Sequence, residues 1–169
     1  MGVFLFAYGS LLNADTNYQL NNYKKKKMYP VIVSGLRRQY NVAGDSETLL
    51  GVYKDNSAVC NGALIKINNN ELDRLTNREK KYTVGRISIK QLIFKYGIKG
   101  NKSQQPIKIS EDDTIIYFKP ITQYVSQYIH TGSVPDTPYL KRCITGASRF
   151  GDVFLQDFID TTYNIDVNK

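Results

Sequence analysis

The sequence predicts an α+β domain, with strands in the first two thirds of the chain and helices in the last third. Three observations support this class. Alternating and β-branched residues recur in runs up to residue 119. Apolar residues at helical spacing occupy residues 138–163, behind a start signal that contains two prolines. Strand and helix segments do not alternate regularly, which argues against a parallel βαβ series.

The length and composition fit one domain with its own core. The chain has 169 residues, of which 41% are hydrophobic, and a domain of this size can bury a substantial core. No run approaches the roughly 18 apolar residues of a membrane span, and the N-terminus lacks the basic and apolar segments of a signal peptide. We therefore expect a single domain over residues 1–169 with no membrane partner.

The first two strands are expected at Val3–Ala7 and at residues 29–42. The first run is wholly apolar and ends abruptly at a small polar turn, Gly9 and Ser10. The second run is long, and Gly35 is expected to bend it. A strand tip that presents a glycine and a hydroxyl is a place where sites are often built, so this turn is a candidate functional loop.

The next two strands are expected at residues 49–54 and 58–67. Between them lies Asp-Asn-Ser, residues 55–57, and Asp and Asn supply the local hydrogen bonds of hairpin-type turns. The sequence therefore predicts a β-hairpin.

A short amphipathic helix is expected at residues 70–82. Leu72 and Leu75 are three residues apart, Asn70 can cap the start, and Glu71 complements the helix dipole in the first turn. Strands are expected again at residues 83–96 and 114–119, separated by a polar loop at 99–105 that is predicted to be disordered.

The last third of the chain is predicted to be helical. Asp136 or Thr137 can cap a helix whose first position is Pro138, where the missing N–H is no loss. Apolar residues then recur at spacings of three and four, and Gly151 ends the segment. A second helix is expected at residues 152–163.

The net charge of +8 is unevenly distributed. Residues 1–110 carry 18 Lys and Arg against 7 Asp and Glu, whereas residues 111–169 carry 5 against 8. The run Lys24–Lys27 could bind a nucleic acid, but no recognised nucleic-acid-binding motif accompanies it. A solvated loop is the favoured interpretation, and a nucleic-acid partner is not expected. The positive field would also attract small anionic substrates.

The cysteine and histidine content argues against a metal site. The two cysteines, Cys60 and Cys143, and the single histidine, His130, form no zinc-binding pattern. We expect a reducing, cytoplasmic location and neither a metal nor another cofactor. His130 is interpreted as a surface residue, and Cys143 as a core residue on the apolar stripe of its helix.

Glu79 is the carboxylate that its position explains least. It follows Leu75 by four residues and Leu72 by seven, which places it on the inward-facing stripe of the predicted helix. A carboxylate there is costly to bury unless it is used. The alternative is a partly solvated ion pair with a nearby basic residue: Arg78, Lys80 or Arg86.

Three segments together resemble the γ-glutamylcyclotransferase-like proteins. They are FAYGSLL at residues 6–12, GALIKI leading into LDRLTNREKKYTVGRI, and PDTPYLKRCITGASRFG followed by FLQDFIDTTY. Each segment alone is a weak signal, but their order and separation extend over nearly the whole chain, as far as Tyr163. The resemblance implies a small mixed β-barrel with flanking helices. It also implies an enzyme that releases a γ-glutamyl group as 5-oxoproline and frees the attached amine or amino acid.

The resemblance also implies roles for individual residues. A loop matching Tyr8, Gly9, Ser10 and Leu11 holds the glutamyl group through its backbone N–H groups. The acid/base glutamate matches Glu79, and a recurrent pocket tyrosine matches Tyr139.

Other residues near these motifs leave alternatives open. Arg86 either pairs with Glu79 or receives the substrate carboxylate. Ser10 has only His130 as a candidate base of the serine-hydrolase type, so a nucleophilic role is not expected. Three further tyrosines are candidates for the pocket: Tyr53, Tyr82 and Tyr117.

Three functional hypotheses follow from these residues. The first is a cyclotransferase for a small γ-glutamyl substrate, the second an inactive binding protein on the same scaffold, and the third a basic nucleic-acid-associated protein. No oligomeric state is predicted.

Overall fold

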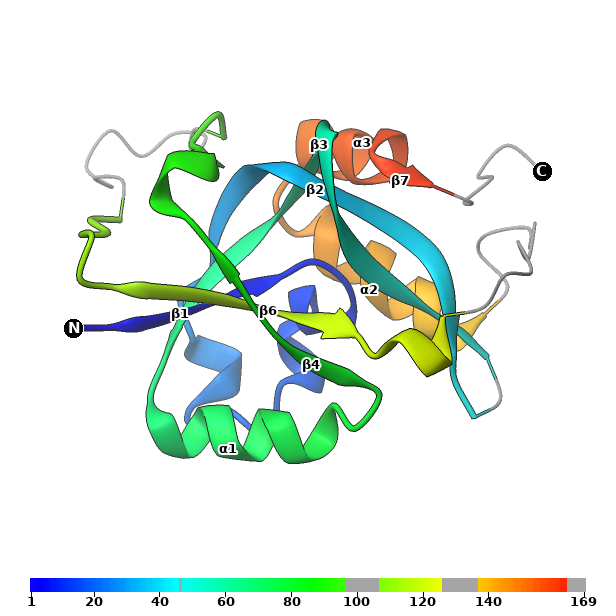
Figure 1. Ribbon diagram of the computed structural model, residues 1–169, viewed down its shortest axis with the longest axis horizontal. Helices are drawn as coiled ribbons and strands as arrows, with labels where there is room; N and C mark the ends of the chain where they lie inside the picture. The colour runs from blue at the N-terminus through cyan, green and yellow to red at the C-terminus, as the bar shows by residue number, and fades with distance from the viewer. Residues whose placement is uncertain (46, 97–106, 126–136, 164–169) are drawn as a thin grey trace.

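The computed structural model describes residues 1–45, 47–96, 107–125 and 137–163 (Figure 1). These residues form seven strands and three α-helices. The strands are β1 (Val3–Ala7), β2 (Tyr29–Ala43), β3 (Thr48–Ile67), β4 (Tyr82–Ile87), β5 (Leu92–Ile93), β6 (Thr114–Pro120) and β7 (Thr162–Tyr163), and the helices are α1 (Asn69–Arg78), α2 (Pro138–Ser148) and α3 (Asp152–Asp160).

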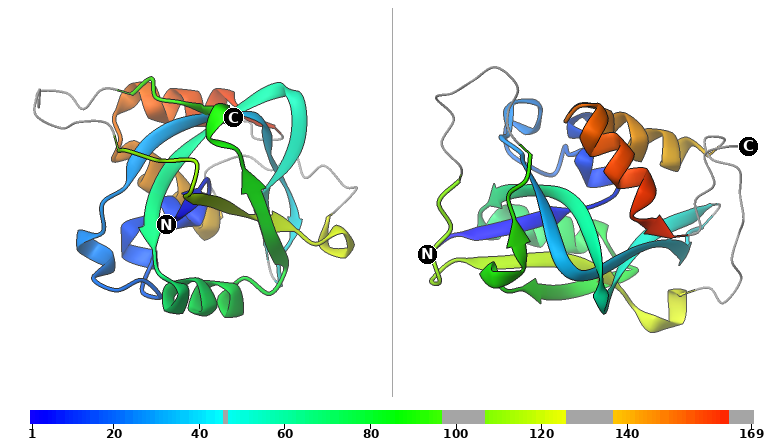
Figure 2. Two further views of the ribbon diagram at one scale, coloured as in Figure 1. Left: turned by 60° about the vertical axis from the view of Figure 1, so that its left-hand side comes forward. Right: turned by 90° about the horizontal axis from the view of Figure 1, so that it is seen from above.

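The strands form one mixed sheet in the order β4-β6-β1-β3-β2-β5, with β7 added beside β2. β1 lies near its centre, parallel to β6 and antiparallel to β3. The sheet curls into a half-barrel, with α1 at one side and α2 and α3 at another (Figure 2). The fold class is therefore the predicted one, an α+β domain built on a small mixed barrel with flanking helices.

The predicted hairpin at residues 55–57 is wrong, because these residues lie inside the continuous strand β3. Asp55 does accept the expected local bond from the Ser57 N–H at 3.0 Å. The chain nevertheless continues, since β2 pairs with β3 on both sides of this point. The pairing register shifts between Ser34 and Leu36, around Gly35 with its positive φ of 84°. Gly35 thus bends β2, as predicted, and β3 follows it.

The first helix is shorter than predicted and begins one residue earlier. Asn68, not Asn70, is the N-cap: its side chain accepts a bond from the Glu71 N–H at 2.8 Å, and the Glu71 carboxylate accepts one from the Asn68 N–H at 3.1 Å. This reciprocal capping box fixes the start of α1. Glu79 is the C-cap residue, so the chain leaves the helix there rather than at residue 82.

Glu71 does more than complement the helix dipole. Its side chain is almost fully buried and pairs with Lys26, whose Nζ lies 2.7 Å from Oε2. Lys26 is therefore part of the structure, contrary to the interpretation of the whole lysine run as a solvated loop. Lys24, Lys25 and Lys27 are exposed, as that interpretation expects.

Two further boundaries differ from the predictions. The expected strand at residues 83–96 is split into β4 and β5 by a short turn of 3₁₀ helix at Ile89–Gln91, whose N-cap is Ser88. The expected helix at residues 152–163 ends at Asp160, and the chain then pairs with β2 as β7. Local apolar spacing does not distinguish a last helical turn from a short strand beside an edge.

The start of α2 is where the sequence predicts it. Thr137 is the N-cap, with its hydroxyl accepting a bond from the Leu140 N–H at 3.2 Å, and Pro138 is the first helical residue. The predicted loop at residues 99–105 lies outside the described residues. No described helix has the length and apolar character needed to cross a bilayer.

Candidate active site

The residues after β1 form one wall of a pocket at the tip of that strand. Tyr8 follows the strand directly, and Gly9 leads into a 3₁₀ turn at Ser10–Leu12. This turn is closed by a hydrogen bond from the Leu12 N–H to the Gly9 carbonyl at 3.0 Å. Among the hydrogen bonds of the described turns and loops, none is donated by the N–H groups of Gly9, Ser10 or Leu11.

Helix α2 holds this turn in place. Gly146 of α2 lies so close to the chain at Leu12 and Asn13 that an added Cβ would overlap their backbone. The Asn13 side chain donates to the Arg142 carbonyl at 3.2 Å. From the other side, the Asn17 side chain donates to the Leu11 carbonyl at 2.7 Å. The turn is therefore fixed by backbone packing and hydrogen bonds, which is the condition for a preorganised binding loop.

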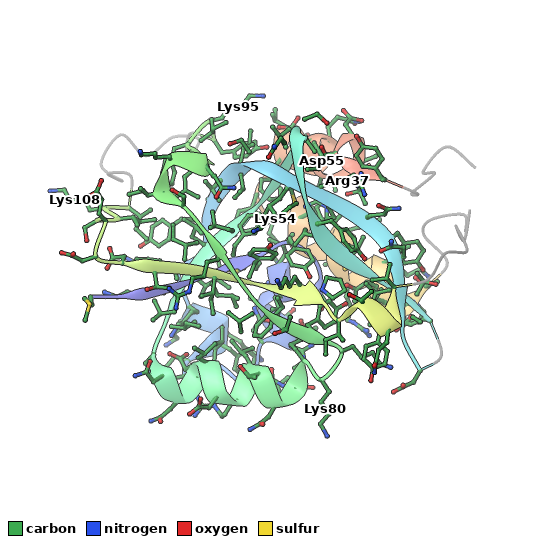
Figure 3. The ribbon with its side chains drawn as sticks, viewed as in Figure 1. Arg37, Lys54, Asp55, Lys80, Lys95 and Lys108 are labelled. Carbon is green, nitrogen blue, oxygen red and sulfur yellow. The ribbon has the colours of Figure 1, made fainter. Side chains whose placement is uncertain are left out.

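Glu79 enters the same pocket from the end of α1. Only 17% of its side chain is exposed, and its Oε1 lies 4.0 Å from Nε of Arg78. Burial raises the pKa of the Glu79 carboxyl above its usual value, and Arg78 opposes this shift. Lys80, the next residue, is exposed and points away from the sheet (Figure 3). Of the ion pairs considered from the sequence, only the long contact with Arg78 is present among the described residues.

Three tyrosines complete the polar part of the pocket, each anchored to the backbone. The Tyr139 hydroxyl accepts a bond from the Leu50 N–H at 3.1 Å, and the Tyr82 hydroxyl donates to the Leu50 carbonyl at 2.8 Å. The Tyr8 hydroxyl donates to the Phe118 carbonyl. Burial raises the pKa of all three phenols, so they are neutral at physiological pH.

Gly9 lies close to Tyr139 within the site. A Cβ at this position would lie 3.1 Å from the Tyr139 hydroxyl oxygen and 3.7 Å from Leu50. The Tyr139 oxygen would have to shift by a few tenths of an ångström, and its hydrogen bond from the Leu50 N–H opposes that shift. A side chain at Gly9 would therefore press on the tyrosine.

The structure brings six of the seven site residues predicted from the sequence into this one pocket, and Tyr82 with them. The sequence does not predict the apolar walls of this pocket. The complete lining is Phe6, Tyr8, Gly9, Ser10, Leu11, Leu50, Glu79, Tyr82, Phe118 and Tyr139. Alternation along the strands indicates that Phe6, Leu50 and Phe118 are buried, but it does not indicate that they face a common pocket.

Arg86 is the predicted site residue that the structure places elsewhere. It is an exposed residue of β4 and lines a separate hollow beside Asp112 and Asp113. It makes no ion pair with Glu79 and does not line the pocket, because residues 79–86 run from the C-cap of α1 outward along an edge strand. Tyr53 and Tyr117 also lie outside the lining, and His130 falls outside the described residues.

Among the described residues, no group of three His, Cys, Asp or Glu side chains could hold a metal ion. Cys60 and Cys143 are free and buried. Burial raises the pKa of the Cys143 thiol to about 12, which supports its interpretation as a core residue and not a nucleophile.

Comparison with known proteins gives a structural match alone. No family model matches the sequence, and no curated protein matches it. YkqA from Bacillus subtilis superposes with a TM-score of 0.65 at 14% identity, over 92% of this chain and 52% of that chain. This chain therefore spans about half the length of YkqA.

Two other solved structures match over most of both chains. A γ-glutamyl cyclotransferase superposes with a TM-score of 0.62 at 16% identity, over 94% of this chain and 86% of that one. A yeast γ-glutamyl cyclotransferase specific to glutathione gives 0.59 at 13% identity, over 95% of each. The chain has the γ-glutamylcyclotransferase-like fold, as its sequence motifs predict.

Proposed function

We propose that this protein is a γ-glutamylcyclotransferase, which cyclises a γ-glutamyl group to 5-oxoproline and releases the attached amine or amino acid. The observation that carries the proposal is the placement of the Glu79 carboxylate. It lies in a sheltered pocket with the Tyr8–Leu11 loop and Tyr139, although these segments are far apart in the sequence. The γ-glutamyl cyclotransferases among the solved structures that share the fold support the same reaction class.

Glu79 acts as the base and then as the acid in this reaction. The substrate's α-ammonium group, with a pKa of about 8, transfers a proton to the carboxylate. The freed amine nitrogen attacks the γ-carbonyl carbon and forms the ring C–N bond. The tetrahedral intermediate then expels the leaving amine, which takes the proton from Glu79 as the old C–N bond breaks. The ring nitrogen still carries a second proton, which Glu79 removes and passes to the released amine, so that 5-oxoproline keeps one N–H and the amine leaves as an ammonium ion. The raised pKa of Glu79 suits both transfers.

The loop and the tyrosines hold the substrate in its reactive conformation. Ring closure occurs within one molecule, so much of the catalytic effect lies in positioning. Backbone N–H groups at Gly9, Ser10 and Leu11 can bind the substrate carboxylate or the oxyanion of the intermediate. The neutral hydroxyl of Tyr139, fixed by Leu50, lies against this loop and adds a polar group that carries no competing charge.

A product assay with matched variants tests this proposal. The protein is incubated with glutathione, γ-glutamyl amino acids and γ-glutamyl-ε-lysine, and 5-oxoproline is measured. We expect release from at least one compound and its loss in Glu79→Gln, which should still bind 5-oxoproline. Asp73→Asn is the control, since Asp73 is an exposed acid on the same helix.

Two results would contradict the proposal. Near-normal turnover by Glu79→Gln would remove Glu79 from the acid/base role. Absence of product from every compound, with 5-oxoproline still bound, would favour an inactive binding protein on this scaffold.

A further inference from the structure

Arg38 of β2 is a fully buried arginine that contacts the back of the candidate loop. Its guanidinium connects β2 to the site loop, to β3 and to the end of α3. The acceptors are the Thr162 hydroxyl (2.7 Å from Nε), the Asn61 side-chain oxygen (2.8 Å), the Phe158 carbonyl (2.9 Å), the Thr161 hydroxyl (3.0 Å), the Asn61 carbonyl, the Cys60 thiol (3.4 Å) and the Tyr8 carbonyl (3.4 Å).

All of these acceptors are neutral groups. Among the described residues, no Asp or Glu forms an ion pair with Arg38. The Phe158 ring, 3.8 Å from the guanidinium carbon, and the carbonyl end of α3 offset part of the cost of burying a cation. A brace between strands and helix needs hydrogen-bond donors but no charge, so the uncompensated cation calls for a further explanation.

The contact with Tyr8 supplies that explanation. The peptide bond between Tyr8 and Gly9 is trans, so its C=O and N–H point in opposite directions. Nη1 of Arg38 binds the carbonyl from outside the pocket lining. Gly9 lines the pocket, and its N–H therefore points away from Arg38. A hydrogen bond from a cation to the carbonyl also polarises the amide and strengthens its N–H as a donor.

We propose that Arg38 is a positioning residue of the candidate site, which orients and polarises the Tyr8–Gly9 peptide so that the Gly9 N–H receives a negatively charged oxygen of the substrate. This inference rests on the proposed cyclotransferase function. The buried positive charge of Arg38 is then compensated by an anion that is present only when substrate or product is bound. Arg38 acts through the peptide and does not touch the substrate.

Three variants separate positioning from bracing. Arg38→Met removes the guanidinium, and Arg38→Lys keeps a charge with fewer donors. Thr162→Val removes the acceptor of Nε but leaves the contact with Tyr8. We expect Arg38→Met to lower kcat per folded molecule by about 10- to 100-fold, less than the roughly 10²- to 10³-fold cost of deleting an oxyanion donor itself. Arg38→Lys should recover part of this loss. Thr162→Val should be less stable yet keep its kcat.

The Gly9 amide gives a readout that does not depend on turnover. In ¹H–¹⁵N spectra, the Gly9 signal should shift in Arg38→Met and in Arg38→Lys, and stay in place in Thr162→Val. Addition of 5-oxoproline should move this signal in the wild type, and a higher concentration should be needed in Arg38→Met. If Arg38→Met does not fold, Arg38→Lys and Thr162→Val provide the same comparison.

The outcomes distinguish this inference from the proposed function. A wild type that releases no 5-oxoproline overturns the function, while the Gly9 signal still decides the role of Arg38. An unchanged Gly9 signal in the Arg38 variants overturns the positioning role. An equal loss of kcat in Thr162→Val and Arg38→Met would show that Arg38 only stabilises the fold, and would overturn the positioning role.

Discussion

Replacing Glu79 by glutamine is expected to stabilise the protein at neutral pH while it removes the proposed activity. Burial raises the pKa of Glu79 in the folded state, so the ionised carboxylate is less favourable there than in the unfolded chain. The folded state binds more protons between the two pKa values. The free energy of unfolding therefore falls as pH rises from the unfolded pKa, about 4.3, through the folded one. Glutamine does not titrate and escapes this loss.

The size of the gain follows from two opposing contributions. Each unit of pKa shift corresponds to about 1.4 kcal/mol of unfolding free energy. This net shift already includes the opposing attraction to Arg78, at 4.0 Å and with 27% of the Arg78 side chain exposed, which is worth about 0–1 kcal/mol. A net gain of about 1 kcal/mol would raise Tm by roughly 2–4 °C in a domain of this size.

Thermal and urea unfolding followed by circular dichroism, between pH 4 and pH 8, test this prediction. The difference between Glu79→Gln and wild type should be smallest at pH 4 and should grow as pH rises through the folded pKa of Glu79. Asp73→Asn serves as the control, with no comparable gain. A variant Glu79→Gln that is less stable than the wild type at pH 7 would show that the carboxylate stabilises the fold, and the reasoning from burial would fail.

Three further substitutions probe the pocket and its support. Tyr139→Phe leaves the buried Leu50 N–H without its acceptor and should cost about 1–3 kcal/mol in urea unfolding; an unchanged midpoint would contradict that hydrogen bond. Burial alone would raise the pKa of Glu71, but its hydrogen bonds, above all the one from Lys26, lower the pKa. Glu71→Ala should therefore reduce the free energy of unfolding by on the order of 3 kcal/mol at pH 7. The difference from wild type should shrink at acid pH, as the wild-type carboxylate becomes protonated. Gly62→Ala places a Cβ against a carbonyl oxygen of β1. It should reduce the free energy of unfolding by about 1–3 kcal/mol and so lower Tm; an unchanged Tm would contradict the close pairing of β1 and β3.

Much of the candidate site could be predicted because its chemistry lies in short local motifs. The Tyr8–Leu11 turn and Glu79 are recognisable from residue types and order, and the structure places them in one pocket. The apolar walls could not be predicted, since the face that Phe6 or Leu50 presents depends on how the whole sheet curls. Arg86 was misplaced because the end of α1 at Glu79 redirects the chain before β4 begins.

The predicted features that differ from the structure share one physical cause. Asp55 and its neighbours carry the residue types of a turn, and residues 55–58 have no paired residue on β2, but pairing with β2 on both sides of them keeps the chain in one strand. The lysine run looked uniformly solvated, yet Lys26 meets Glu71 across 45 residues of sequence. The role of Arg38 likewise has no local sequence signal, because its acceptors come from the loop after β1, from β3 and from α3. Pairings between distant segments decide these features.

The most direct test of the proposed function is the identity of the product formed in H₂¹⁸O. In cyclisation the substrate's own α-amine displaces the leaving amine, so no oxygen from water enters the product. Mass spectrometry should then find unlabelled 5-oxoproline and free amine in equal amounts, formed by the wild type and not by Glu79→Gln. Glutamate carrying ¹⁸O in its side-chain carboxylate would show hydrolysis and would contradict cyclisation at this site.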